Sequence, residues 1–237
     1  MASVYSKNLQ VFNAKQFRES VAEADPSRLY LSYGLTIPWA NDAEPTQANT
    51  SIKTEYEIWQ NMIGAKAVTG NDVRHVVPRY DWASGQSYMA YDDKTDSLDL
   101  YANNYNFYIL TEDWNVYKCL SNNRGGLSTV KPTSVSYTAP SIETDGYIWK
   151  YMYTVAPSEQ LKFTTASYIP VKKLIADDNS LQWKVQNNAI DGGIEIIKVD
   201  NIGSGYKSNS TISLTIKGDG TGANAYAFVN TTSNTIS

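Results

Sequence analysis

The sequence predicts an α+β protein that is predominantly antiparallel β, with two N-terminal helices packed on β-sheets and a C-terminal all-β module with glycine turns. Three observations predict this fold class. Apolar residues recur at helical spacing twice near the N-terminus, short β-branched or alternating runs dominate from Ala65 onward, and glycine-punctuated aliphatic runs fill residues 192–230. At 237 residues, 42 % of them hydrophobic, the chain is long enough to bury a core.

The two helices are predicted from their apolar faces. The first covers KNLQVFNAKQFRESVAEAD from Lys7 and ends before Pro26. The second lies in SIKTEYEIWQNMIG from Ser51, with Gly64 expected as its C-terminal cap. The predicted faces consist of Leu9, Phe12, Phe17 and Val21 in the first helix and of Ile52, Tyr56, Trp59 and Ile63 in the second.

The strands are predicted from short apolar runs bounded by turn residues. RLYLSYGLTIPW predicts a strand that leaves into a turn at Gly34 and Pro38, and AKAVT, VRHVVPRYDW and SYIPVKKLI predict further strands. NFYILTEDWNVYKCL predicts a hairpin with strands over 107–111 and 116–120.

DGYIWKYMYTV opens with an Asp-Gly turn and then alternates large side chains on both faces. One face would carry Tyr147, Trp149, Tyr151 and Tyr153, and the other Ile148, Lys150, Met152 and Thr154. Such a strand is either covered on both sides by its own chain or covered on one side and exposed to a partner protein on the other.

The composition divides the chain at a polar linker, residues 176–180. We expect an α+β region over residues 1–175, with a loop-rich insertion over 92–140. A β-rich module would follow over 181–237 and would continue beyond Ser237.

Several classes of protein are disfavoured by charge and composition. The net charge is −4 without a dense Lys/Arg cluster, so we expect no nucleic-acid partner. The N-terminus lacks a signal-peptide run, and no stretch approaches the roughly 18 apolar residues of a membrane span, so we expect no membrane insertion and synthesis in a reducing cytoplasm. Cys119 is the only cysteine, so neither an intrachain disulfide nor a Cys/His zinc site is expected.

The segment VRHVVPRYDW holds the only histidine, His75, near Arg79 and Asp81. A Ser-His-Asp centre would need a strained nucleophile turn such as G-x-S-x-G, which the sequence lacks. We therefore interpret His75 as a strand residue. Arg79 and Asp81 would each reach a partner in a facing strand or subunit, where a buried ion pair fixes orientation more than it stabilises.

Acidic and glycine-rich segments offer further chemical alternatives. Paired carboxylates could indicate a glycosidase, and the candidates are Asp92, Asp93, Asp96, Asp99, Glu112 and Asp113. The first four lack the glycine and closing glutamate of a calcium loop, and the last two suit a hairpin turn. GSGY and GDGTGA lack the Gly-Lys-Ser/Thr ending of a phosphate loop. We expect no catalytic residue, metal, cofactor or small-molecule substrate, and hence no enzyme.

Six stretches, in order, resemble one family: the baseplate wedge subunit, the product of gene eight, of T-even-type contractile-tail bacteriophages. They lie between Lys7 and Ile175 and read FNAKQFRES, LYLSYGLTIPW, WQNMIG, HVVPRYDW, VYKCL and DGYIWKYMYTV. Beyond Ile175 the sequence instead resembles a glycine-punctuated β-repeat of marine myophage structural proteins, so contacts of that part cannot be transferred from the family.

The resemblance implies a structural virion protein of the tail baseplate, assembled in the host cytoplasm. Members dimerise, contact other wedge subunits and transmit the rearrangement that accompanies sheath contraction. Motif residues carried over as fold- or interface-determining are Pro78, Arg79, Asp81, Trp82, Asp145, Gly146, Tyr147, Trp149 and Tyr151.

Aromatic residues are the other candidates for an interface, because large rings dominate binding when they are fully desolvated. There are eighteen tyrosines and six tryptophans. The family motif also includes Pro38 and Trp39, and our candidate anchors are Trp39, Trp59, Trp82, Trp114 and Trp149, with burial in the core as the alternative for each. Because aromatic rings also stack on sugars, a tail-associated carbohydrate-binding or adhesion module is the alternative function, followed by a tail glycosidase.

Overall fold

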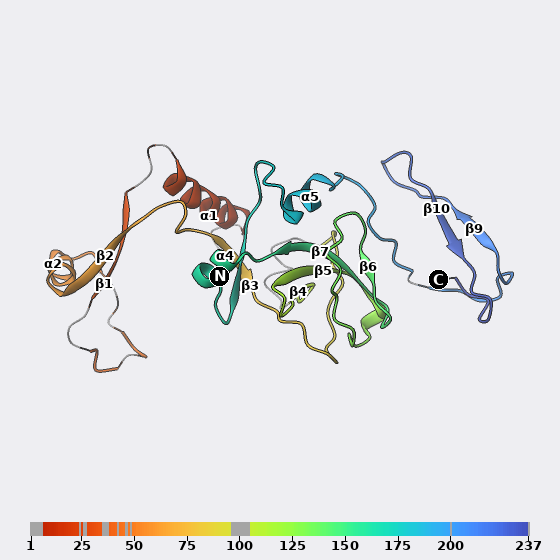
Figure 1. Cartoon of the computed structure of the whole chain (residues 1–237), viewed down its shortest axis with the longest axis horizontal. Helices are drawn as coiled ribbons and strands as arrows, with labels where there is room; N and C mark the ends of the chain where they lie inside the picture. The colour runs from red at the N-terminus through yellow and green to blue at the C-terminus, as the bar shows by residue number, and fades with distance from the viewer. Residues whose placement is uncertain are drawn as a thin grey trace. The chain divides into compact units, whose positions relative to one another are not determined.

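The computed structural model describes residues 7–23, 25, 28–34, 38–41, 43–45, 47, 49–95, 105–199 and 201–236. Helices and several small sheets alternate along the chain (Figure 1), as expected of an α+β fold. Internal contacts divide the chain into two units. Unit 1 comprises Met1–Val76 with Pro170–Lys172, and unit 2 comprises Val77–Ile169 with Lys173–Ser237. The expected boundaries, 1–175 and 181–237, remain a prediction.

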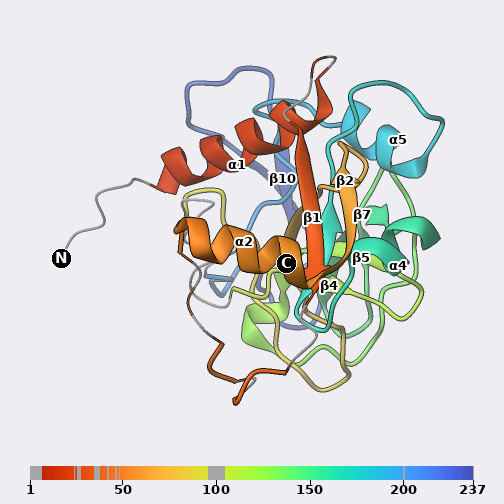
Figure 2. The same ribbon diagram turned by 90° about the vertical axis from the view of Figure 1, so that its left-hand side faces the viewer.

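Unit 1 contains both predicted helices and an antiparallel two-stranded sheet. Helix α1 spans Lys7–Ala22 and strand β1 spans Leu29–Gly34. Helix α2, Ile52–Asn61, begins at Ser51, whose hydroxyl accepts a hydrogen bond from the Thr54 N–H at 3.2 Å. It leads directly into β2, Met62–Val68, which pairs with β1 (Figure 2). Both helices and both strands are confirmed.

Two expectations about these helices are wrong. Gly64 is not a helix cap: it lies inside β2, where a Cβ atom would come within 2.8 Å of the Tyr33 ring. Glycine is therefore suited to the close approach of Tyr33. The helices also do not lay their apolar faces on a sheet, since α2 has no buried residue and Val21 of α1 is buried only near its C-terminal end.

The main sheet of unit 2 has the strand order β4-β5-β7-β6. Strands β4 (Tyr108–Leu110) and β5 (Asn115–Asn122) form the predicted hairpin. β7 (Tyr147–Thr154) pairs antiparallel with β5 on one side and with β6 (Ser141–Ile142) on the other. The segment 92–140, expected to be a loop-rich insertion, thus supplies two strands of this sheet.

The core of unit 2 covers both faces of the sheet. Ile109 of β4 joins a cluster with Tyr117 and Trp149, whereas its neighbours Tyr108 and Leu110 join a second cluster on the opposite face. A strand buried on both sides requires covering elements on each, and helix α5 provides one through Val185. This packing explains why the hairpin lacks a polar face.

The remaining elements are short. Helix α4 spans Pro157–Phe163, and strand β8, Tyr168–Val171, pairs with β3, His75–Pro78. Helix α5, Leu181–Asn187, begins at Ser180, whose hydroxyl accepts from the Trp183 N–H.

The sequence predicted an all-β C-terminal part. This prediction is wrong, because α5 is helical and residues 188–199 lack regular structure. Alternating β sequence pairs only in β9, Thr211–Leu214, and β10, Ala225–Phe228, apart from a bridge between Val229 and Ile236. Ser180 as cap, with Leu181 and Val185 one turn apart, favours the helix locally.

Candidate functional site

The Asp-Gly-Tyr motif holds the loops above the main sheet in place. The Asp145 carboxylate accepts hydrogen bonds from the backbone N–H groups of Thr129, Val130 and Tyr147, at 2.7, 2.9 and 3.0 Å. Burial raises the pKa of this carboxyl, but the three N–H donors together with a hydrogen bond from the Ser128 side chain lower it, and the net shift is downward. Gly146 has φ +83°, and a Cβ there would lie 2.8 Å from the Asn123 side chain.

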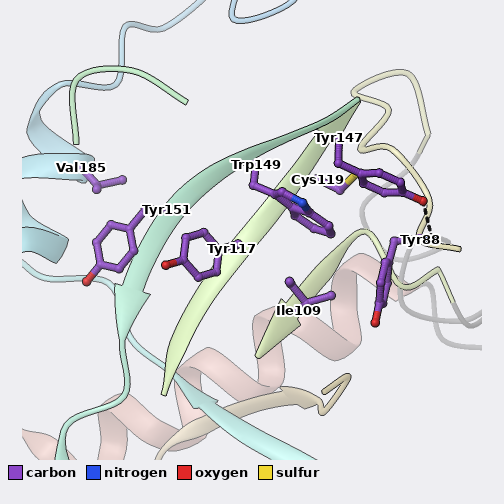
Figure 3. Packing of buried hydrophobic residues seen from close by; sticks show 8 residues of the cluster. All are labelled: Tyr88, Ile109, Tyr117, Cys119, Tyr147, Trp149, Tyr151 and Val185. Carbon is purple, nitrogen blue, oxygen red and sulfur yellow. Dashed lines mark hydrogen bonds between the residues drawn. The ribbon is translucent and has the colours of Figure 1, made fainter. Parts of the chain in front are cut away.

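The aromatic residues that follow this turn lie in the core. Tyr147, Trp149 and Tyr151 point from β7 into one buried cluster (Figure 3). The Tyr147 and Trp149 rings stack at 5.4 Å, and the Tyr147 hydroxyl donates to the Gly126 carbonyl at 2.6 Å while accepting from the Tyr88 N–H. Trp149 is 0 % exposed, so the structure places it in the core and not on an interface of the folded chain.

Arg79 and Asp81 pair with each other and do not face a separate partner strand each. The Arg79 Nε donates to both Asp81 carboxylate oxygens, at 2.8 and 3.1 Å, and its guanidinium also donates to the Thr165 carbonyl and lies 5.7 Å from the Trp114 ring centroid. Within this chain the pair is not buried, because 58 % of the Asp81 side chain is exposed. Arg79 therefore fastens the end of β3 to the 165–167 turn, where its own N–H donates to the Ser167 carbonyl.

The other candidate anchor tryptophans divide between core and surface. Trp82 packs against the Trp149 cluster and its indole N–H donates to the Ser128 hydroxyl at 3.1 Å. Trp114 turns the β4–β5 hairpin with φ +61° and packs against the second cluster. Pro38 and Trp39 are exposed, and Trp59 is the most exposed tryptophan that the structure describes, at 72 %.

Trp59 belongs to an exposed apolar surface on unit 1, which we call the apolar arm: β1, α2 and β2, residues 29–34 and 52–68. Its large exposed side chains are between 50 and 85 % accessible: Tyr30, Leu31, Tyr33, Ile52, Tyr56, Ile58, Trp59 and Ile63. A two-stranded sheet is at best marginally stable by itself, and a concentration of large exposed apolar side chains on so few elements is typical of an interaction site. The sequence predicted the apolar face of α2 but placed it against the chain's own sheets.

The histidine and the acid pair that were considered for catalysis lie close to cationic side chains. Burial lowers the pKa of His75, and the cations Arg18, Lys15 and Arg74 lower it further. A carboxylate partner would instead raise the pKa of the histidine. Lys131 donates to both Glu112, at 2.5 Å, and Asp113, at 3.3 Å, so this acid pair is bound by a cation.

Asp92 accepts a hydrogen bond from the Lys94 N–H, while Asp96 and Asp99 lie outside the described residues. Within the described ranges, no group of three or more His, Cys, Asp or Glu side chains has the arrangement of a metal site. None of the helices that the structure describes is both long enough and apolar enough for a membrane crossing.

Comparison with known proteins identifies a relative. No family model matches the chain. Over 199 residues the chain is 24 % identical to the baseplate wedge protein gp8 of Enterobacteria phage T4. This chain is a distant homologue of that protein. The match takes in 69 % of the chain but 59 % of the length of gp8, and it confirms the resemblance to the wedge subunit family carried by the sequence motifs.

Proposed function

We propose that the chain is a structural component of a contractile phage tail, a baseplate wedge subunit that works by assembly. The homology to a baseplate wedge protein supports this proposal, and the apolar arm is the observation that carries it. A protein that acts by docking must present surface that its own fold leaves uncovered, and the arm presents large rings on a small sheet and helix. Such a subunit resides in the tail baseplate of the virion and is not an enzyme.

The partners we propose are other baseplate wedge subunits and a second copy of the chain. Burying Tyr30, Tyr56 and Trp59 against a neighbour would remove apolar surface from water at about 25 cal/mol per Å². The main sheet of unit 2, buried on both faces by two clusters, would carry the displacement that accompanies sheath contraction from one interface to another.

The experiment that tests this function is reconstitution with neighbouring wedge proteins. Trp59→Ala and Tyr56→Ala together should weaken co-elution on size-exclusion chromatography and reduce the dimer fraction by light scattering, while the variant melts as the unchanged protein does. Leu161→Ala serves as the matched control, because Leu161 is 93 % exposed but lies outside the arm. Unimpaired assembly of the double variant would contradict the docking role of the arm.

A second candidate function rests on strand β10. Tyr226 and Phe228 lie two residues apart and are 62 and 64 % exposed, with Ser213 and Thr211 opposite them on β9. Two rings on one strand face beside hydroxyl groups could stack on a sugar. A glycan array with the full chain and with its Tyr226→Ala variant decides this: ring-dependent glycan binding would establish an adhesion module in the C-terminal hairpin.

A further inference from the structure

One carboxylate joins two lysines on neighbouring strands of the main sheet. Lys118 of β5 lies directly opposite Lys150 of β7 in the antiparallel register, an arrangement in which like charges repel. Glu195 reaches both: one carboxylate oxygen lies 3.3 Å from the Lys118 ammonium, and the other pairs with the Lys150 ammonium.

Both lysines are largely covered. Their side chains are 19 and 20 % exposed, and burial lowers the pKa of each, with the Lys118 charge lowering that of Lys150 further. The Lys118 ammonium also lies 4.6 Å from the centroid of the Tyr91 ring. Because a half-buried pair of cations is unfavourable, a carboxylate at this point stabilises the sheet more than an exposed ion pair would.

Glu195 belongs to an irregular segment, residues 188–199, which we call the strap. It contains two consecutive glycines, Gly192 with φ +73° and Gly193, and its isoleucines at 190, 194 and 197 are between 52 and 80 % exposed. Asn188 ties its beginning to the Tyr137 carbonyl. A hollow of about 230 Å³ lies between the strap, the 136–140 loop and Lys150. Apart from Ile196, which is partly buried, the isoleucines of the strap contribute little packing, and Glu195 joins the strap to the main sheet through its two ion pairs.

We propose that the strap is displaceable and that Lys118 and Lys150 beneath it form a docking site for an acidic segment of a neighbouring protein, with Glu195 as the internal occupant. The occupant already present shows the chemistry the two lysines accept: a carboxylate between two ammonium groups. A partner with two carboxylates would give each lysine its own charge-assisted hydrogen bond, whereas Glu195 is shared. This site lies in unit 2 and does not depend on the apolar arm or on the baseplate assignment.

The role of Glu195 in holding the strap is tested by hydrogen exchange of the strap and by acetylation of Lys118 and Lys150, both read by mass spectrometry. Glu195→Gln should raise exchange in residues 188–199 about threefold, the size expected when a partly exposed ion pair is removed. It should also speed acetylation of both lysines. Asp191→Asn, which removes an exposed strap charge outside the pair, should change neither rate. The double variant Glu195→Lys with Lys150→Glu restores an opposite-charge pair and should restore protection.

The docking site is tested by competition. At matched ionic strength, hexaglutamate should protect Lys118 and Lys150 of the Glu195→Gln variant from acetylation, while hexaglutamine should not. Unchanged strap exchange in Glu195→Gln, or equal effects of the two peptides, would overturn the proposal.

Discussion

Replacing Trp149 by alanine tests the division of the tryptophans into core and surface. Trp149 is 0 % exposed and contacts Tyr147 by stacking and Tyr88 edge-on, with ring centroids 5.4 and 5.7 Å away. Truncating a buried Trp to Ala typically costs about 3–5 kcal/mol in unfolding free energy, through lost transfer energy and the cavity left behind.

The indole N–H of Trp149 places the expected loss of unfolding free energy at the lower end of that range. It is buried and finds no hydrogen-bond acceptor among the described residues, and a buried unsatisfied donor costs about 1–3 kcal/mol. Because truncation also removes this donor, we expect Trp149→Ala to cost about 3 kcal/mol. Trp149→Phe, which keeps most of the ring and removes the donor, should cost less than half as much.

The assay is urea unfolding followed by tryptophan fluorescence and circular dichroism, with Trp59→Ala as the matched surface variant. Trp59 is 72 % exposed, and its truncation should change the unfolding free energy by about 0.5 kcal/mol or less. Equal stability losses for the two variants, or an unchanged midpoint for Trp149→Ala together with failed assembly, would refute the placement of Trp149 in the core.

Three further predictions concern the turn and the core of unit 2. Gly146→Ala should lower the unfolding free energy by about 1–3 kcal/mol in thermal or chemical melts, because φ +83° is strained for alanine and its Cβ would meet Asn123. Gly85→Ala, with φ +81° and open space around the Cβ, should show only the loss that comes from backbone strain. The lowered pKa of Asp145 means that the stability it contributes is complete above the unfolded pKa of about 3.9 and is lost as pH falls through the lower folded pKa. Asp145→Asn should therefore be less stable than the unchanged protein at pH 7 and should approach its stability in strong acid, as melts across pH would show. Burial raises the pKa of the Cys119 thiol to about 12, so Ellman's reagent at pH 8 should label it only in denaturant; rapid labelling of the native protein would contradict its burial.

Local sequence patterns predicted a strand or helix well where the spacing of its apolar side chains and the residues of the adjoining turn indicated the same element. The alternation of Tyr147, Trp149 and Tyr151 predicted β7, and the Asp-Gly turn before it is fixed by three N–H donors to one carboxylate. Helix α5 was missed because its seven residues carry a short apolar pattern and precede a glycine-rich segment that dominates the composition. Short helices take much of their stability from tertiary contacts, here through Val185, which the sequence does not display.

Long-range pairings were beyond the sequence. An apolar face indicates that burial is favourable, but it does not indicate which chain covers it. The apolar face of α2 was therefore expected on the chain's own sheets, and it lies exposed instead. Glu195 lies 77 positions from Lys118 in the sequence, and no local pattern marks Glu195 among the other acids. Arg79 and Asp81 are close in sequence, yet their pairing with each other depends on the 165–167 turn.

Hydrogen exchange of the chain, free and in assembled baseplates, tests most directly whether it works by docking its apolar arm. The account predicts that protection on assembly concentrates in residues 29–34 and 52–68, with little change in the already buried strands β5 and β7. Protection spread elsewhere while the arm exchanges as fast as in the free chain would contradict it.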